Sequence, residues 1–254
     1  MRRVTGIAAA PGVAVGAWMR VRAETPIAGG TIAPGDADAE IARLASAVEG
    51  AATQLEAIAE RMDAEGHADE GAIFLAQAAI ARDPALLAMA EGRIRDAGED
   101  GIAAVQAAAR SFADQLAAIG DELLAARAAD VLDVGARIAR HLAGRADDTG
   151  PALDRPVIVV ADDLPPSVTA TLPRERLLGI ALEGSSPTAH AAILARAYGI
   201  PAVVGAAGLA ATLDGAAGLA AALDGAPDAA AADIELALDG GTGEIVLDPA
   251  PPTR

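Results

Sequence analysis

A change of hydrophobic period constrains this chain more than any other feature of its sequence. Residues 4–22 alternate between β-branched and small side chains, residues 36–144 repeat apolar side chains at helical spacing, and short apolar runs return after residue 151. Alternation every second residue is typical of strands, and a spacing of three to four is typical of helices. The pattern therefore predicts one helical block flanked on both sides by segments that contain strands.

The helical block is expected to consist of several helices with short connections, which is typical of an antiparallel bundle. Asp83 before Pro84 indicates a helix start, since Asp caps the first turn and Pro fits the first helical position. The first apolar stripe ends at Gly66 and His67 and comprises Ile41, Leu44, Val48, Leu55, Ile58 and Met62. Further helices are predicted over 70–81, 84–97, 101–119 and 121–142, with Gly120 and Gly144 as stops.

The flanking segments predict an α/β arrangement. Val13–Val21 is expected to form one strand after a turn at Pro11 and Gly12. The runs 234–238 and 244–247 flank a glycine-rich turn and predict a hairpin. Continuous apolar runs, which are typical of strands buried on both faces, occur over 157–161, 177–182 and 202–204.

An isolated two-stranded hairpin is only marginally stable, so the first and last strands are expected to share one sheet. The helical block is then an insertion into an α/β domain. The α/β domain is predicted over 1–33 and 146–254, and the helical subdomain over 34–145. The nearly identical segments 205–214 and 215–224 are interpreted as a duplicated surface helix and turn without chemistry of their own.

Composition excludes several classes of function. The chain has no cysteine, which excludes disulfides and thiolate chemistry and favours an intracellular, cytoplasmic protein. Its formal charge of −17 argues against nucleic acid and anionic membranes. The charge would suit a basic protein partner, and it would equally keep a chain that is 53% hydrophobic in solution. No uncharged run of about 18 apolar residues occurs, so no membrane span is predicted.

The stretch Glu183–Arg196 holds the strongest candidate for chemistry. Thr188 is expected to cap a short helix that ends at Gly199, which places His190 in the first helical turn. The unpaired backbone N–H groups and the positive end of the helix dipole favour an anion there. Because imidazole is a competent covalent nucleophile, His190 is well placed to carry a phosphoryl group.

No other histidine forms a site by its spacing. His67 is interpreted as a loop residue and His141 as a capping or surface residue near a helix end. No HExxH pair is present, so no zinc site is expected and no metal is assigned to this chain. The absence of a Walker loop, a GxGxxG loop and a GxSxG elbow argues against a built-in nucleotide site and a hydrolase triad.

Four segments together resemble a known family. Thr188–Arg196, followed by Gly199–Gly205, is similar to the phosphohistidine motif of phosphoenolpyruvate-utilising enzymes, which include enzyme I of the bacterial sugar phosphotransferase system. Gly6–Gly16, Ala126–Arg137 and Ala161–Thr169 resemble further segments of enzyme I and occur in its order. The resemblance covers nearly the whole chain and narrows the family to enzyme I, or phosphoenolpyruvate-protein phosphotransferase.

The resemblance implies an α/β phosphohistidine (swivelling) domain with an inserted all-α helical-bundle subdomain. His190 would be phosphorylated on Nε2 and would exchange its phosphoryl group with HPr, the small histidine phosphocarrier, or with an HPr-like protein. Full enzyme I also has a C-terminal barrel that binds phosphoenolpyruvate and Mg²⁺, and nothing in this chain corresponds to it. No cofactor is therefore expected in this chain, and the phosphoenolpyruvate-binding domain would act in cis or in trans.

The resemblance also implies two sets of supporting residues. Thr169 matches a threonine that hydrogen-bonds near the active histidine, and the wider set expected to support the phosphate comprises Thr169, Thr188, Ser185, Ser186 and Arg196. The set expected to dock the carrier comprises Phe74, Leu75, Ala79, Ile80 and Arg127. The apolar members would alternatively form bundle core, and Arg127 would alternatively form a surface ion pair.

Four positions depart from the family pattern. The family has two glycines where this chain has Ser185 and Ser186, it often has Ser where this chain has Ala189, and it often has His where this chain has Gln77. Glycine permits a positive φ and a close phosphate more readily than serine does.

Three alternatives stay open. They are the enzyme-I-like domain of a dihydroxyacetone kinase phosphoryl donor subunit, a degenerate binding module that is not phosphorylated, and the swivelling domain of a dikinase. The departures favour only the binding module, and the start of the chain and the helical insertion argue against the dikinase domain.

Overall fold

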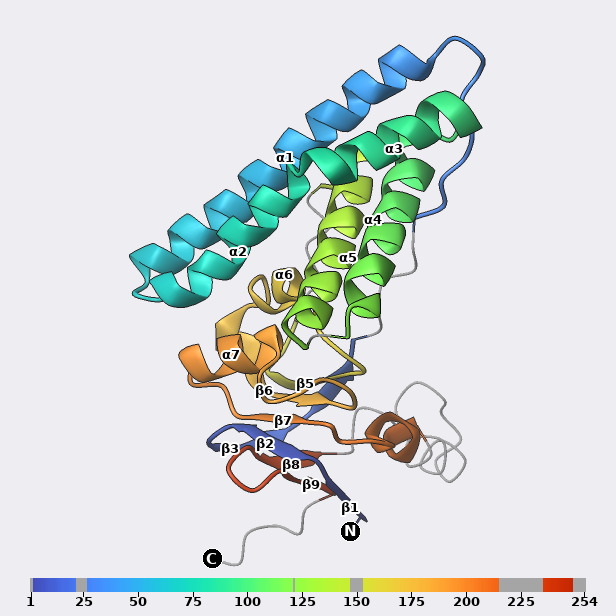
Figure 1. Ribbon diagram of the computed structural model, residues 1–254. Coiled ribbons are helices and arrows are strands. Elements are labelled where there is room, and N and C mark those ends of the chain that lie inside the picture. The colour runs from blue at the N-terminus through green and yellow to red at the C-terminus, as the bar shows by residue number, and fades with distance from the viewer. Residues whose placement is uncertain (1, 22–26, 121, 147–152, 215–234, 249–254) are drawn as a thin grey trace, which may run out of the picture. The chain divides into compact units, whose positions relative to one another are not determined.

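The computed structural model describes residues 2–21, 27–120, 122–146, 153–214 and 235–248 (Figure 1). The chain divides into two compact units. The α/β unit comprises Met1–Glu24 and Gly150–Arg254, and the helical unit comprises Thr25–Thr149. The helical unit is thus inserted between two segments of the α/β unit, which confirms the predicted fold class.

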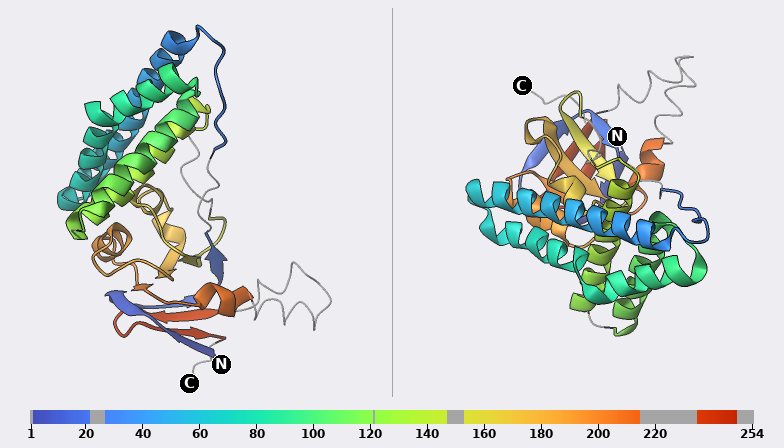
Figure 2. Two further views of the ribbon diagram at one scale, coloured as in Figure 1. Left: turned by 45° about the vertical axis from the view of Figure 1, so that its right-hand side comes forward. Right: turned by 90° about the horizontal axis from the view of Figure 1, so that it is seen from above.

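Five helices occur in the described part of the helical unit (Figures 1 and 2). The long first helix packs along the second, and the fourth along the fifth. Each predicted helix is present, and its ends lie within a few residues of the predicted ones. Their bounds are α1 Ala37–Ala64, α2 Ala68–Ala81, α3 Pro84–Ala97, α4 Gly101–Ala118 and α5 Glu122–Leu142.

Local sequence signals explain where these helices begin. Asp83 Oδ1 accepts hydrogen bonds from the N–H groups of Ala85 and Leu86, so Asp83 caps α3 as predicted. Asp100 caps α4 in the same way through the N–H of Ala103. The predicted stripe of α1 faces the core of the unit, and its buried members are Leu44, Val48, Leu55, Ile58 and Met62.

Small residues let two of the helices approach closely. A Cβ atom added to Gly135 on α5 would lie 2.5 Å from the Cβ of Ala109 on α4. Ala104, Ala108 and Ala113 on the same helix are also buried. With only 2% aromatic residues in the chain, the close approach replaces the bulky side chains that fill most cores.

In the described part of the α/β unit, nine strands form two sheets (Figure 1). The four-stranded antiparallel sheet has the order β1-β9-β8-β3, with β1 Arg2–Thr5, β9 Glu244–Leu247, β8 Leu236–Asp239 and β3 Val13–Gly16. The five-stranded sheet has the order β2-β7-β6-β5-β4, with β2 Ile7–Ala10, β7 Ala202–Val204, β6 Leu177–Leu182, β5 Val157–Ala161 and β4 Trp18–Arg20.

The pairing confirms that the first and last strands share a sheet. The strands β8 and β9 form the predicted hairpin, β1 pairs with β9, and β3 pairs with β8. Residue 234, which was predicted to begin the hairpin, lies outside the described residues. The three internal apolar runs form β5, β6 and β7, and these strands are parallel.

The prediction of one strand over Val13–Val21 is wrong. The chain leaves β8 after Gly16, and β4 joins the other sheet, where the carbonyl of Ala17 accepts a hydrogen bond from the N–H of Ile158. A Cβ atom at Gly16 would lie 2.7 Å from Leu178 Cδ1, so glycine permits the close approach at the change of sheet. The alternation continues across the break, which is why it did not reveal two strands.

The five-stranded sheet is buried on both faces. Val157, Val159 and Ala161 belong to one apolar cluster, and Ile158 and Val160 belong to the other. This division explains why β5 is a continuous apolar run. The first cluster also contains buried residues of the helix α7 (His190–Ala197), and the second also contains buried residues of the four-stranded sheet.

The first copy of the duplicated segment contributes to the core. Residues 209–214 are helical, and Leu209 and Leu213 are fully buried in the second cluster. The segment is therefore a helix with one face in the core. The second copy, 215–224, lies outside the described residues.

Candidate active site

The candidate site lies where the parallel strands of the five-stranded sheet end. The loop after β6 begins at Glu183, whose N–H donates to the carbonyl of Ala161 at the end of β5. Gly184 donates to the carbonyl of Asp162 at 2.8 Å and accepts from the N–H of Gly205, which follows β7, at 2.9 Å. The loop that leads to His190 is therefore held at its start by residues following both neighbouring strands.

Ser185 adopts the backbone conformation that glycine would favour. Its φ is +71°, whereas Ser186 is not among the described residues with a positive φ. The loop therefore retains a left-handed residue at the first of the two positions where the family has glycine. Ser185 Oγ is buried, and no hydrogen-bond partner for it is found among the described residues.

The prediction that Thr188 caps the histidine helix is wrong. The helix α7 begins at His190, and its N-cap is Ala189, which makes no side-chain capping bond. Thr188 Oγ1 instead lies 2.9 Å from Ser186 Oγ, and the N–H of Ala189 donates to the carbonyl of Ser186. This turn moves the N-cap of the helix one residue beyond the threonine.

The end of α7 is as predicted. Gly199 has a φ of +65°, and the N–H of Ile200 donates to the carbonyl of Ala195 at 2.9 Å. The N–H of Gly199 donates to the carbonyl of Arg196, which completes a Schellman motif. His190 is therefore the first residue of an eight-residue helix whose two ends are both defined by local hydrogen bonds.

His190 is partly exposed at the first helical position. The N–H groups in the first turn of a helix have no intrahelical carbonyl to accept from them, and they lie at the positive end of the helix dipole. An anion beside the imidazole of His190 would be stabilised by both effects. The geometry can therefore hold a covalently bound phosphoryl group.

Thr169 lies in α6 (Pro166–Thr169), which packs against α7. The residue is buried, and its hydroxyl donates to the carbonyl of Pro165 at 3.1 Å. Because the hydroxyl proton is already used, Thr169 Oγ1 can act only as an acceptor toward a further group.

Arg196, which was expected to support the phosphate, binds backbone carbonyls. Its Nη1 donates to the carbonyl of Ala9 at 2.7 Å and to the carbonyl of Pro187 at 3.0 Å. The residue therefore connects the end of β2 to the loop that precedes His190. Sequence motifs do not reveal this bond, because Ala9 and Arg196 are 187 residues apart.

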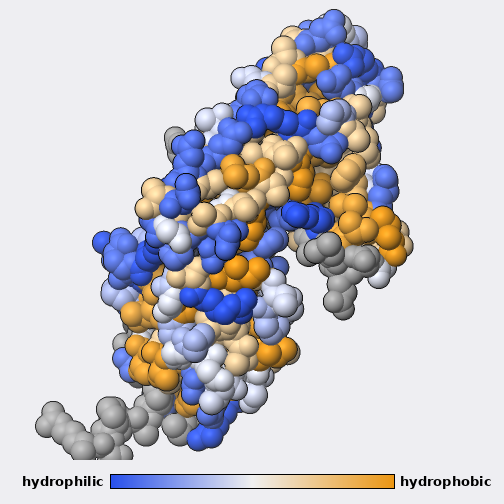
Figure 3. Space-filling view, turned by 60° about the vertical axis from the view of Figure 1, so that its left-hand side comes forward, coloured by the Kyte–Doolittle hydropathy of each residue, from blue (hydrophilic) through white to orange (hydrophobic). Residues whose placement is uncertain are grey.

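The prediction that Phe74 docks the carrier is wrong. Phe74 is fully buried, on the face of α2 that also carries Gly71 and Ala78, so it belongs to the bundle core. Leu75 and Ala79 lie on the opposite face and are exposed. Ile80 is partly buried. Figure 3 shows that apolar surface on the molecule is interrupted by hydrophilic side chains.

The polar residues near the expected docking helix form a buried group. Arg127 Nη1 lies 3.4 Å from Asp130 Oδ2, an ion pair with a buried carboxylate, and the expected docking role of Arg127 stays a prediction. Gln77 is fully buried, and its Nε2 donates to Asp130 Oδ1 at 3.0 Å. Gln77 on α2 therefore binds the fifth helix.

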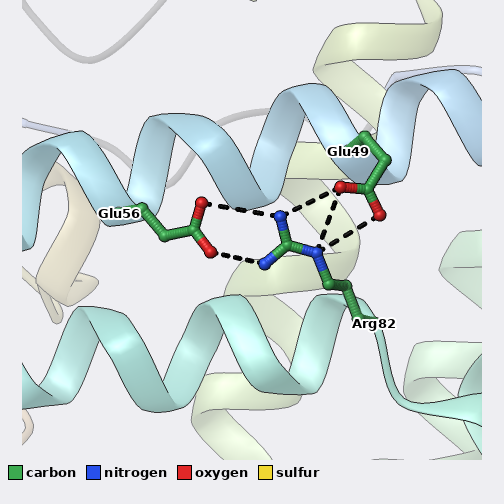
Figure 4. Close-up of polar contacts among 3 residues, drawn as sticks. All are labelled: Glu49, Glu56 and Arg82. Atoms are coloured by element: carbon green, nitrogen blue, oxygen red, sulfur yellow. Dashed lines mark hydrogen bonds and ion pairs between the residues drawn. The ribbon is translucent and has the colours of Figure 1, made fainter.

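A charged bridge that the sequence did not reveal joins α1 to the end of α2 (Figure 4). Arg82 donates to the carboxylates of Glu49 and Glu56. Its hydrogen bonds hold the pKa of Glu49 below the usual range for a glutamate, and the two carboxylates raise the pKa of Arg82. The bridge connects the two helices beside the exposed face of α2.

The described residues contain neither a metal-binding cluster nor a single helix that could span a membrane. No group of three or more His, Asp or Glu side chains there could hold a metal ion. No single described helix is long and apolar enough to cross a membrane, although α2 and α3 together meet the criteria of length and composition with a bend of 41°.

Comparison with known proteins matches both units. A model for the N-terminal part of phosphoenolpyruvate-utilising enzymes matches residues 5–127, and a model for the mobile domain of these enzymes matches residues 153–243. The chain is 33% identical over 251 residues to the phosphoenolpyruvate-protein phosphotransferase of Geobacillus stearothermophilus. This match covers 98% of this chain and 40% of the relative. It is 38% identical over 214 residues to a multiphosphoryl transfer protein of Xanthomonas campestris pv. campestris, and this match covers 81% of this chain and 24% of the relative.

A solved structure agrees with these matches. A solution NMR structure of enzyme I has a TM-score of 0.65 and 30% sequence identity, and the match covers 97% of this chain and 93% of that one. The fold and these matches together define a phosphoenolpyruvate-utilising enzyme with an N-terminal part and a mobile domain. The chain belongs to the enzyme I family of phosphoenolpyruvate-utilising enzymes. It spans about 40% of the length of the enzyme I relatives from Geobacillus and Bacillus.

Proposed function

We propose that the chain carries a phosphoryl group on Nε2 of His190 and exchanges it with the active histidine of HPr or an HPr-like carrier. The observation that supports this most directly is the position of His190 at the start of α7, after a loop bonded to the residues that follow β5 and β7. Positioning and charge stabilisation account for most of the catalysis in phosphoryl transfer. A helix N-terminus beside a nucleophile supplies both.

The exchange balances without any other reactant. The lone pair of His190 Nε2 attacks the phosphorus of the phosphorylated carrier, a new N–P bond forms, and the carrier's N–P bond breaks. The electron pair of the broken bond stays on the carrier's imidazole. For Nε2 to present a lone pair, the neutral ring of His190 must hold its proton on Nδ1. Thr169 Oγ1, whose own proton is donated to Pro165, is suited to accept that Nδ1–H.

The helical unit is proposed to dock the carrier through α2. Leu75 is 53% exposed, and with Ala79 it provides an apolar strip on a unit of net negative charge. The segment 25–149 contains 22 acidic residues and 10 arginines, a formal charge of −12 within the total of −17. Such a surface attracts a carrier whose docking face combines apolar and basic residues.

The test of transfer is incubation with phosphorylated HPr, followed by the intact mass of the chain. The wild type is expected to gain one phosphate that is labile in acid, and His190→Ala is expected to gain none. An unchanged mass of the wild type, under conditions that label an intact enzyme I, would favour a binding module that is not phosphorylated. Phosphoenolpyruvate and Mg²⁺ without a second protein are expected to leave the mass unchanged.

The test of docking uses the absence of lysine from this chain, whose basic residues are all arginine. A zero-length carbodiimide joins carboxylates to amines, so a cross-link from a carboxylate here must end on an amine of the carrier or on an N-terminus. Cross-links are expected to fall within residues 36–83 and to decrease in Leu75→Asp. Cross-links confined to the α/β unit would contradict docking on α2.

A further inference from the structure

The guanidinium of Arg196 joins two segments that are distant in the sequence. Its Nη1 donates to the carbonyl of Ala9 on β2 and to the carbonyl of Pro187, which lies three residues before His190. Ala9 is buried, and β2 is paired with β7. The carbonyl of Pro187 is therefore bonded, through one nitrogen, to a strand that is itself fixed in the sheet.

The direction of the side chain places this bond at the start of α7. Arg196 lies six residues after His190, yet its guanidinium reaches a carbonyl that precedes the helix. Side chains on a helix lean toward its N-terminus, which makes this reach possible. Hydrogen bonds from a charged donor are stronger than those between neutral groups. The short turn between Ser186 and Ala189 is thereby supported from outside as well as by its own hydrogen bond.

We propose that Arg196 is a positioning residue, which fixes the loop before His190 against β2 and so sets the orientation in which the imidazole meets the phosphoryl group. The proposal rests on the proposed function and deepens it. Arg196 acts through the carbonyl of Pro187. In this way β2, which belongs to the N-terminal motif Gly6–Gly16, becomes part of the phosphoryl-transfer site.

A matched control exists within the same unit. Arg176 Nη1 donates to the carbonyl of Leu153 at 2.7 Å, which is the same kind of bond at the same length, and Leu153 does not belong to the histidine loop. Arg176→Ala loses one such bond and Arg196→Ala loses two, so both should cost stability, measured by urea unfolding, with the larger loss in Arg196→Ala. Only Arg196→Ala should slow phosphoryl transfer.

The experiment measures transfer from phosphorylated HPr to the chain at increasing HPr concentration. For Arg196→Ala, the rate at saturating HPr is expected to fall about tenfold or more, because small misplacement of a reacting group is costly. The HPr concentration that gives half the maximal rate should not change. Arg196→Lys should recover part of the rate, since one ammonium nitrogen can donate to both carbonyls.

The possible results distinguish a positioning role of Arg196 from a structural role and from a docking role. Equal rates for Arg196→Ala and Arg176→Ala would overturn the inference and leave the proposed function intact. A loss that lies wholly in the half-saturating concentration would also overturn it, since that result indicates docking. Failure of the wild type to accept a phosphoryl group would overturn the proposed function, and the inference with it. If Arg196→Ala does not fold, the comparison is made between Arg196→Lys and Arg176→Lys.

Discussion

The carboxylate of Glu40, on α1, accepts a 2.7 Å hydrogen bond from the backbone N–H of Gly101, the first residue of α4. Glu40 is buried, and its other oxygen binds Arg43. A side chain of one helix thus satisfies an unpaired N–H at the start of another. A Cβ atom at Gly101 would lie 3.0 Å from Glu40 Oε1, so glycine leaves room for the carboxylate.

Glu40→Ala is expected to destabilise the chain by about 1–3 kcal/mol, because it leaves the buried N–H of Gly101 without an acceptor. The measurement is urea unfolding followed by far-UV circular dichroism. Glu40→Gln retains an acceptor oxygen and should lose less. Equal losses in the two variants would show that the hydrogen bond to Gly101 is not the source of the effect.

Ser185→Gly is expected to stabilise the chain by up to about 1 kcal/mol, because a residue other than glycine pays a steric cost in the left-handed region. Ser186→Gly is the matched control. Ser186 is not among the described residues with a positive φ, so its replacement gains no steric relief. It adds backbone freedom to the unfolded chain and removes the hydroxyl that lies 2.9 Å from Thr188 Oγ1, and it should therefore destabilise. Thermal unfolding of both variants tests the pair. A fall in melting temperature for Ser185→Gly would contradict the prediction.

Gly240→Ala is expected to destabilise severely, by about 3 kcal/mol or more. A Cβ atom there would lie 1.8 Å from the carbonyl oxygen of Ala10, and a backbone atom cannot move aside. Gly241→Ala, one residue further on, would meet only the side chain of Asp239 at 3.3 Å and should be much milder. Urea unfolding of the two variants, with intact mass to verify each, makes the comparison. Similar losses would show that the close approach is not decisive.

The bridge from Arg82 to Glu49 predicts a dependence of stability on pH. Arg82 lowers the pKa of Glu49 in the folded chain, so the bridge contributes stability above the pKa of an unfolded glutamate, about 4.3. The contribution is lost as pH falls through the lower, folded pKa. Arg82→Ala should therefore be less stable than the wild type at pH 7, and the difference should vanish at low pH and shrink in high salt.

A mutant cycle, in which the two glutamates are changed together, isolates the contribution of the bridge to stability. In a background of Glu49→Gln and Glu56→Gln, Arg82→Ala should change the free energy of unfolding little at pH 7. A difference that persists in that background would trace the effect to packing of the arginine side chain, and the bridge would not be its cause.

The sequence alone determined the features that depend on neighbouring residues. The helical period of α1, the cap at Asp83 and the stop at Gly199 were all predicted, because each is a contact between residues a few positions apart. The position of His190 in the first turn of a helix was also predicted correctly, although the predicted cap, Thr188, is not the N-cap. Composition and charge limited the classes of partner without placing any contact.

Only the tertiary structure decided what depends on contacts between distant residues. The change of sheet at Ala17 is set by pairing with β5, which local alternation does not report. Packing against the neighbouring helices determines which face of α2 is buried, so Phe74 lies in the core while Leu75 is exposed. The bond from Arg196 to Ala9 joins residues 187 positions apart, and it exists only because the fold brings β2 beside the start of the histidine helix. The physical reason is the same in each case: these contacts are made across elements that the sequence separates.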